Sequence, residues 1–202
     1  MDPISPVILQ TERLYAREFA KDDVSTVFAY AGNVENTGFL PWSPEPYEDV
    51  EKFVERRLAS QIEQPRRVFD AAICLKETDE MIGSMGLTLD EKLTQAELGY
   101  LFNMKYWHKG YAREAAKGFL GFGFLGLDLH RIYARCDSEN IASYKVMESI
   151  GMRREAHFIK NEFRSVFGKA SWRSTLEYAI LQKEYLMRLA DGDYSPAGKI
   201  TD

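Results

Sequence analysis

The sequence predicts one α+β domain, with a central and largely antiparallel sheet of six or seven strands flanked by about four helices. Two patterns indicate this class. Three segments in the middle of the chain, 68–75, 81–89 and 95–102, have strand character and are joined by short polar turns, which is typical of an antiparallel meander. On either side of this block, in 50–58 and 112–120, apolar residues recur at helical spacing.

The N-terminal part of the chain is expected to add an extended segment, two helices and a loop. Residues 7–19 have strand character with a polar break in the middle. Asp22 and Asp23 are good N-cap residues for a helix that runs to about residue 31, where a glycine follows. The segment 36–46 is dense in proline and aromatic residues, which predicts a loop ahead of the charged amphipathic helix.

The C-terminal half is expected to contain two helices and three strands. Gly110 begins the first helix, and the second lies between Asn140 and Gly151, which suit its two ends. We expect, in order, a helix from 110, a strand at 131–136, a helix at 143–149, and strands near 152–163 and 171–181. The aromatic residues Phe158, Phe163, Phe167 and Trp172 are expected to pack these last strands. The domain is expected to span 1–190, and 191–202 to be a flexible tail.

The charge balance and the hydropathy pattern exclude several classes of function. The 202 residues carry 26 basic and 31 acidic side chains, a net charge of −5, and a general nucleic-acid binder shows the opposite balance. We therefore expect no nucleic acid partner, whereas a mildly acidic surface attracts cationic partners such as amines. No stretch reaches the ~20 apolar residues of a membrane span, so no membrane partner is expected, and residues 1–10 lack the pattern of a signal sequence.

Cysteine and histidine are sparse and widely spaced. Cys74 and Cys136 stand far apart, and together with three histidines they show no metal-ligand spacing, so no metal site is expected. Buried free thiols are favoured over a disulfide. These features predict a reduced, cytoplasmic location.

The segment 97–117 carries the most informative pattern in the chain. A strand ends, a short loop follows, and a helix begins near Gly110 with small residues in its first turn. A helix start exposes free backbone N–H groups and the positive end of the helix dipole, and Gly110 and Ala112 lack the bulk that would keep a phosphate away. Lys109 and Arg113 add positive charge. The pattern predicts a pyrophosphate cradle, with a helix that begins at glycine for packing reasons as the alternative.

These residues resemble the acetyl-CoA signature of the GCN5-related N-acetyltransferase (GNAT) superfamily. The signature Gln/Arg-x-x-Gly-x-Gly/Ala here reads Trp107-His-Lys-Gly110-Tyr-Ala112, with Trp in place of Gln or Arg. That variant is similar to a branch of the superfamily that contains bacterial ribosomal-protein N-terminal alanine acetyltransferases. Segments 11–19, 39–42 and 140–152 resemble the same branch in the same order, so the resemblance covers residues 9 to about 181.

The resemblance implies the GNAT fold, with acetyl-CoA as co-substrate. It places the CoA pyrophosphate on the backbone amides of residues 108–113, where Arg113 replaces a usual Thr or Ser. The pantetheine arm would pair with the strand end at Leu101 and Phe102. Asn140 would reach the pantetheine amide, although it is equally suited to capping a helix. The residues expected to contact acetyl-CoA are Leu101, Phe102, Trp107, His108, Lys109, Gly110, Tyr111, Ala112, Arg113, Asn140, Ser143 and Lys145.

Acetyl transfer requires that the amine lose a proton, the thioester carbonyl be polarised and the departing thiolate be protonated or stabilised. Many members of the superfamily use a tyrosine for the thiolate where this chain has Met147. Ser143 lies one turn earlier on the same helix face, and the resembling branch has Ser there, so we assign its hydroxyl to the CoA sulfur, with a structural Ser in the first turn of the helix as the alternative. Glu97 is expected to be the base, directly or through water, or else a structural carboxylate paired with an arginine such as Arg17 or Arg135.

The acceptor pocket is the part of the site that the sequence defines least. Trp42 and Tyr106 are candidates for its wall, with ordinary packing as the alternative. We expect an acetyl-CoA-dependent N-acetyltransferase that moves an acetyl group to a primary amine, such as a protein N-terminal α-amine, by direct attack on the thioester. A small-molecule amine (an antibiotic, a polyamine or an amino-acid derivative) stays open as acceptor. So do a CoA-binding module without turnover and a homodimer.

Overall fold

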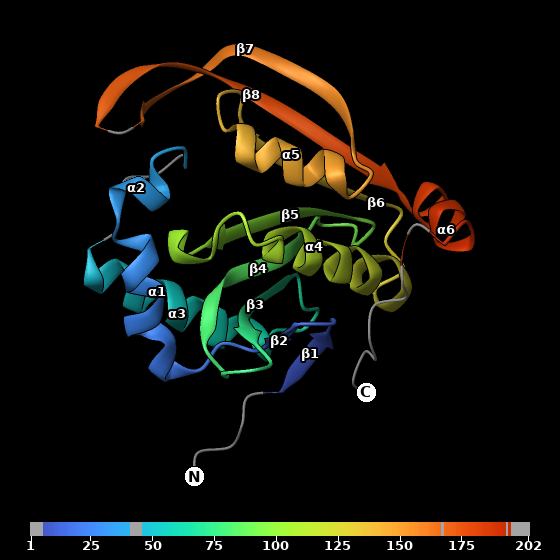
Figure 1. Ribbon diagram of the computed structural model, residues 1–202, viewed down its shortest axis with the longest axis horizontal. Coiled ribbons are helices and arrows are strands. Elements are labelled where there is room, and N and C mark those ends of the chain that lie inside the picture. The colour runs from blue at the N-terminus through green and yellow to red at the C-terminus, as the bar shows by residue number, and fades with distance from the viewer. Residues whose placement is uncertain (1–5, 41–45, 167, 193, 195–202) are drawn as a thin grey trace.

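One mixed sheet of eight strands organises the residues that the computed structural model describes: 6–40, 46–166, 168–192 and 194 (Figure 1). The strands lie in the order β1-β2-β3-β4-β5-β6-β8-β7, and every neighbouring pair is antiparallel except β5 and β6. Their bounds are β1 (Val7–Gln10), β2 (Leu14–Arg17), β3 (Val68–Leu75), β4 (Met81–Leu89), β5 (Gln95–Phe102), β6 (Arg131–Asp137), β7 (Arg153–Val166) and β8 (Lys169–Leu181).

The α+β class and the largely antiparallel sheet are confirmed, and so is the meander of β3, β4 and β5. The sheet has eight strands, rather than six or seven, because the expected extended segment turns back on itself. At its polar break the Thr11 N–H donates to the Leu14 carbonyl at 2.8 Å, and β1 and β2 pair on either side of this turn.

Six α-helices flank the sheet in the described part of the chain, where about four were expected. Their bounds are α1 (Val24–Ala31), α2 (Val34–Thr37), α3 (Tyr47–Gln61), α4 (Tyr111–Gly121), α5 (Ile141–Ser149) and α6 (Gln182–Ala190). Of the two additional helices, α2 is a single turn that begins before the expected loop, capped by Asn33. The other, α6, follows β8 directly, and the Glu184 carboxylate caps it by accepting from the Leu181 N–H at 2.8 Å.

The sheet separates two cores. The larger core lies under α4 and α5, where side chains such as Phe119 and Leu120 are fully buried. The smaller core lies between the other face and the pair α1 and α3, around Tyr30 and Val50. Because both faces are covered, the sheet is a fixed frame for the loops at its ends.

The strands β5 and β6 part in the middle of the sheet. They pair in parallel only where residues 95–97 meet 131–133, although β5 continues to Phe102 and β6 to Asp137. The helices that follow them, α4 and α5, lie side by side and contact each other (Figure 1). The loop before α4 and the first turn of α5 therefore extend from the two strand ends that diverge.

A long hairpin of β7 and β8 extends beyond the rest of the sheet (Figure 1). The Phe163 and Trp172 rings pack against each other across the two strands as expected, with centroids 5.5 Å apart, but they are 64% and 59% exposed, and Phe158 is 42% exposed. The hairpin runs past the edge of the core here, so no helix covers these rings. Phe167 lies outside the described residues.

Candidate active site

The loop between β5 and α4 is shaped by two residues in the left-handed region. His108 has φ of 60° and Gly110 of 80°, and α4 begins at Tyr111, close to the expected position. A β-carbon on Gly110 would meet only Arg13 Nη2, at 3.4 Å, in the described part of the chain, so the space at the helix start is open. Left-handed residues turn successive N–H groups into an anion-binding concavity, and the first N–H groups of α4 have no partner within the helix. This geometry fits a pyrophosphate at residues 108–113.

The β1–β2 turn holds this loop in place. Arg13 Nη1 donates to the Lys109 carbonyl at 3.1 Å. The Glu114 carboxylate accepts from Thr11 Oγ1 at 2.6 Å and from the Arg13 backbone N–H at 2.7 Å. Burial alone would raise the pKa of Glu114, but these hydrogen bonds hold it below its usual value. The sequence analysis missed Arg13 and Glu114, although both fall in segments that resemble the GNAT branch.

Trp107 joins the loop to the end of β5. Its Nε1 donates to the Phe102 carbonyl at 2.8 Å, and Asn36 Nδ2 donates to the same oxygen at 2.9 Å. Trp107 therefore braces the strand end, which gives a reason for Trp at the first signature position. Two protein donors therefore already occupy the Phe102 carbonyl, which makes it less suited than the Leu101 backbone to the pairing expected for a pantetheine arm.

Ser143 and Tyr100 form a hydroxyl pair between α5 and β5. The Tyr100 phenol donates to the Ser143 carbonyl at 3.0 Å, and its oxygen also lies 3.0 Å from Ser143 Oγ. The Ser143 side chain also acts on the Cys136 thiol on β6, whose pKa it lowers against the larger effect of burial. Asn140 Oδ1 accepts from the Ser143 N–H at 3.1 Å, so Asn140 is the N-cap of α5. Helix capping was the alternative to a contact with the pantetheine amide.

The groups around Ser143 are proton donors at neutral pH. Burial raises the pKa of Tyr100, and burial raises the pKa of Cys136 to about 11. Met147, one turn along α5, is buried in the core. Ser143 and Tyr100 are therefore the hydroxyls that α5 and β5 bring to this point, and the sequence analysis missed Tyr100.

Glu97 lies on the other face of β5 from Tyr100, because three positions separate them and side chains alternate along a strand. Its register partner on β6 is Tyr133. This is the face opposite the hydroxyl pair. A base and a thiolate donor on opposite faces suit an acceptor that approaches from one side while the thiol leaves toward the other.

Neither arginine considered for Glu97 is its partner. Arg17 pairs with Asp23 at 2.7 Å, and Arg135 pairs with Glu177 at 2.7 Å. Glu97 acts on Arg135 only as a nearby charge. In the described part of the chain Glu97 forms no ion pair, which leaves its carboxylate available for a proton.

A buried carboxylate fixes the far end of β6. The Asp137 side chain has no exposed surface and accepts from Arg164 at 2.7 Å and from Arg173 at 2.8 Å. Burial would raise its pKa, but hydrogen bonds and charge from Arg173, together with the Arg164 charge, lower it. Arg164 also donates to the carbonyls of Phe39 and Leu40, which ties the β7–β8 hairpin to the chain after α2.

The structure brings the remaining candidates together only in part. The Glu80 side chain raises the pKa of Tyr106 to about 12, and Lys109 Nζ lies 5.2 Å from the Tyr106 ring centre. These contacts hold Tyr106 beside the β3–β4 turn. Lys145 is exposed on α5. Trp42 lies outside the described residues.

Tyr111, Ala112 and Arg113 complete the start of α4. The side chains of Tyr111 and Ala112 pack against the larger core, so these residues offer only their backbone to a phosphate. Arg113 is exposed and stands one turn after Gly110. The described residues contain no helix long and apolar enough to cross a membrane and no group of three or more His, Cys, Asp or Glu side chains that could hold a metal ion.

Comparison with known proteins defines the class. The model of the acetyltransferase (GNAT) domain family matches residues 13–153. An uncharacterized N-acetyltransferase of Bacillus subtilis (strain 168), YnaD, is 34% identical over 177 residues, which are 88% of this chain and 98% of YnaD. The structure of a GNAT-family acetyltransferase from Bacillus anthracis is 33% identical, with a TM-score of 0.75, over 87% of this chain and 99% of that one.

The chain therefore belongs to the GNAT acetyltransferase family and is an N-acetyltransferase that uses acetyl-CoA. Two more distant structures share the fold alone. Spermidine N-acetyltransferase of Vibrio cholerae, in complex with CoA and spermine, is 20% identical with a TM-score of 0.74, over 86% of this chain and 98% of that one. RimL, a ribosomal alpha-N-protein acetyltransferase in complex with CoA, is 17% identical with a TM-score of 0.73, over 87% of this chain and 98% of that one.

Proposed function

We propose that the acceptor is the α-amine of a protein N-terminus. The observation that supports this most is the pairing of carboxylates where β5 and β6 part. Glu177 is paired with Arg131 and Arg135, and Asp137 is paired with two further arginines. Glu97 also lies where β5 and β6 part, and in the described part of the chain it forms no ion pair with an arginine. A polyamine such as spermidine carries several ammonium groups that each call for a negative partner, whereas one α-amine needs one.

The exposed side chains of the β7–β8 hairpin support a protein acceptor. Phe158, Ile159, Phe163 and Trp172 are 42%, 66%, 64% and 59% exposed, and the last two rings lie 5.5 Å apart. Exposed apolar patches are one of the features that mark sites of protein contact. Arg164, the neighbour of Phe163 on β7, joins the hairpin to Asp137 at the end of β6, so the Phe163 and Trp172 rings lie on the other face of the hairpin that this contact holds at the strand end.

An α-amine also suits Glu97 as the base, because a carboxylate is a weak base. The pKa of an α-amine is about 7.7–8.0, so a useful fraction is neutral at pH 7, whereas a lysine amine at about 10.4 needs a stronger base. Glu97, directly or through one water, is suited to accept the proton that the amine loses on attack. Much of the rate then comes from holding the two substrates in line.

Acetyl-CoA supplies the activated acyl group, and a new C–N bond replaces its C–S bond. Ser143 Oγ is the proposed hydrogen-bond donor to the sulfur as negative charge develops there. The Tyr100 hydroxyl, 3.0 Å from Ser143 Oγ, would turn its proton from the Ser143 carbonyl to Ser143 Oγ, so that the Ser143 proton is free to point at the sulfur. The N–H groups of residues 108–113 and the brace from Arg13 fix the phosphate end, which positions the acyl group.

A panel of acceptors tests this proposal by CoA release. We expect kcat/KM to be about tenfold or more higher, about 1.4 kcal/mol in transition-state free energy, for peptides with a free N-terminus than for spermidine or for N-blocked peptides that contain lysine. Spermidine as the better substrate would contradict the proposal.

The role of the exposed hairpin side chains is tested by comparing a protein acceptor with a small α-amine. We expect Trp172→Ala to lower kcat/KM for a protein acceptor while leaving a small α-amine, such as an amino-acid amide, unchanged. A size-exclusion measurement of the same variant separates this role from a dimer contact. Loss of a dimer with unchanged protein acetylation would assign the patch to self-association instead.

A further inference from the structure

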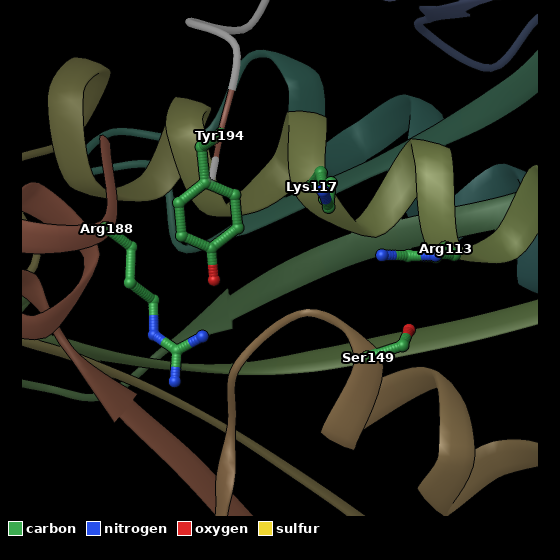
Figure 2. A pocket seen from close by; sticks show the side chains of 5 residues that line it. All are labelled: Arg113, Lys117, Ser149, Arg188 and Tyr194. Atoms are coloured by element: carbon green, nitrogen blue, oxygen red, sulfur yellow. The ribbon is translucent and has the colours of Figure 1, made fainter. Parts of the chain in front are cut away.

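A second hollow lies beside the loop before α4, between α4, the end of α5 and the C-terminal segment (Figure 2). Its volume is about 210 Å³, below the roughly 300–1,000 Å³ of pockets that enclose a whole small molecule, so it is sized for part of a ligand. Figure 2 shows the side chains of Arg113 and Arg188 entering it from opposite sides. Its lining consists of Arg113, Lys117, Ser149, Arg188 and Tyr194.

Three of these five side chains are cationic and none is acidic. Nearby surface arginines are paired, Arg13 with Glu114 and Arg153 with Glu184. Arg113 and Arg188 form no ion pair in the described part of the chain. Like charges this close repel one another in the absence of an anion, and Arg is the side chain best shaped to bind a phosphate group through two hydrogen bonds. The charge pattern therefore calls for an anion.

The wall that Tyr194 forms is well packed. The Tyr194 ring stacks on Tyr185 with centroids 5.0 Å apart, and its hydroxyl donates to the Ile150 carbonyl at 2.5 Å. Gly151 has φ of 79°, and a β-carbon there would lie 2.6 Å from the Tyr194 hydroxyl and 2.9 Å from Arg188 Cζ. Glycine at this turn thus lets Arg188 and Tyr194 approach the end of α5.

The hollow shares Arg113 with the proposed pyrophosphate cradle. Gly110, Arg113 and Lys117 follow one face of α4 over seven residues, about 10 Å. A more open hollow is lined by Gly110, Arg113 and Lys117 together with Glu12, Arg13 and Glu114, so it shares Arg113 and Lys117 with the cationic one. In acetyl-CoA a phosphate monoester on the ribose stands next to the pyrophosphate. With the pyrophosphate at the loop before α4, this second phosphate would lie further along α4, where the hollow is.

We propose that this hollow binds the 3′-phosphate of acetyl-CoA and that Arg188, supplied by α6, sets the preference for the phosphorylated coenzyme. The inference rests on the proposed placement of the pyrophosphate at residues 108–113. A phosphate monoester carries a charge of about −1.5 to −2, which the two arginines, Arg113 and Arg188, match. Arg188 and Tyr194 lie beyond residues 13–153, the part that the family model matches, so this subsite is built by the chain's own C-terminal segment.

Titration calorimetry with CoA and with dephospho-CoA, which lacks this phosphate, tests the inference. We expect the unaltered protein to bind CoA about tenfold or more tightly than dephospho-CoA, and Arg188→Ala to lose most of that preference by weakening CoA alone. Lys183→Ala removes a charge from the same helix without lining the hollow, and should keep the preference. Arg188→Glu should weaken CoA further, again with little effect on dephospho-CoA.

Three outcomes would overturn the inference. One is equal binding of CoA and dephospho-CoA by the unaltered protein. Another is equal weakening of both ligands by Arg188→Ala. The third is binding of inorganic phosphate that Arg188→Ala abolishes while the preference for CoA persists, since the hollow would then serve a separate anion. No acceptor is used, so failure here is distinct from failure of the proposed N-terminal acetylation.

Discussion

The hydrogen bond between Ser143 and Tyr100 leads to a prediction about the departing thiolate. We expect Ser143→Ala to lower kcat about 10²-fold, the lower end of what a proton donor contributes, with little change in acetyl-CoA affinity because the loop before α4 is untouched. Tyr100→Phe keeps the ring but removes the partner of Ser143 Oγ. One lost hydrogen bond of about 1 kcal/mol should lower kcat by about fivefold to tenfold. Steady-state CoA release measures both effects.

The matched control for this pair is Tyr144→Phe. Tyr144 lies next to Ser143 on α5 and packs against the larger core, but its hydroxyl has no assigned role. We expect its kcat to match that of the unaltered protein. An unchanged kcat for Tyr100→Phe, or an equal loss for Tyr144→Phe, would remove Tyr100 from the mechanism.

These two residues show what the sequence can and cannot predict about single side chains. Ser143 follows from its position on a helix, because helical spacing fixes its face. Tyr100 lies 43 residues away and meets Ser143 only because α5 packs on β5. The alternatives for Glu97 were also undecidable from the sequence, because Arg17 and Arg135 are taken by other carboxylates that long-range pairing brings to them.

At the level of elements, the loop before α4 depends on a backbone conformation that favours glycine. We expect Gly110→Ala, at φ of 80°, to cost roughly 1–2 kcal/mol of stability and to weaken acetyl-CoA binding, because relief of the strain turns the N–H groups of the cradle. Calorimetric titration with acetyl-CoA and thermal unfolding measure the two effects.

Gly168 provides the control for backbone strain. It has φ of 77°, and a β-carbon there would meet nothing within 4 Å in the described part of the chain. Gly168→Ala should therefore cost a similar amount of stability without altering acetyl-CoA affinity. Equal weakening of acetyl-CoA binding by both substitutions would show that the strain, and not the cradle, is responsible.

Elements with strong local signals could be predicted, and elements without them could not. The helix from Gly110 follows from a glycine start and a regular apolar spacing, and the structure begins it at Tyr111. By contrast, β8 ends at Leu181 and α6 begins at Gln182, with no glycine, proline or loop between them, so the sequence does not mark where the strand ends and the helix begins. Arg188 and Tyr194, which depend on α6 and on the packing beyond it, were missed for that reason.

At the level of the whole molecule, Asp137 joins parts of the chain that are far apart in sequence. It connects β6 to β7 and β8 through Arg164 and Arg173, and Arg164 reaches on to the chain after α2. Its carboxylate is fully buried, so removal of its charge would leave two arginines without their shared partner. Breaking a buried pair from one side costs about 3–5 kcal/mol.

This contact makes the stability of the protein depend on pH in a predictable direction. The folded pKa of Asp137 lies below the unfolded value of about 3.9, so its stabilisation is complete above that pH and is lost as pH falls through the folded pKa. We expect urea unfolding to show Asp137→Asn about 3 kcal/mol or more less stable at pH 7, with the difference shrinking below about pH 4. Glu139→Gln, at the exposed partner of Arg173, should cost no more than about 1 kcal/mol. A loss that is the same at every pH, or as large for Glu139→Gln, would show that the charge of Asp137 is not what holds the hairpin to the sheet.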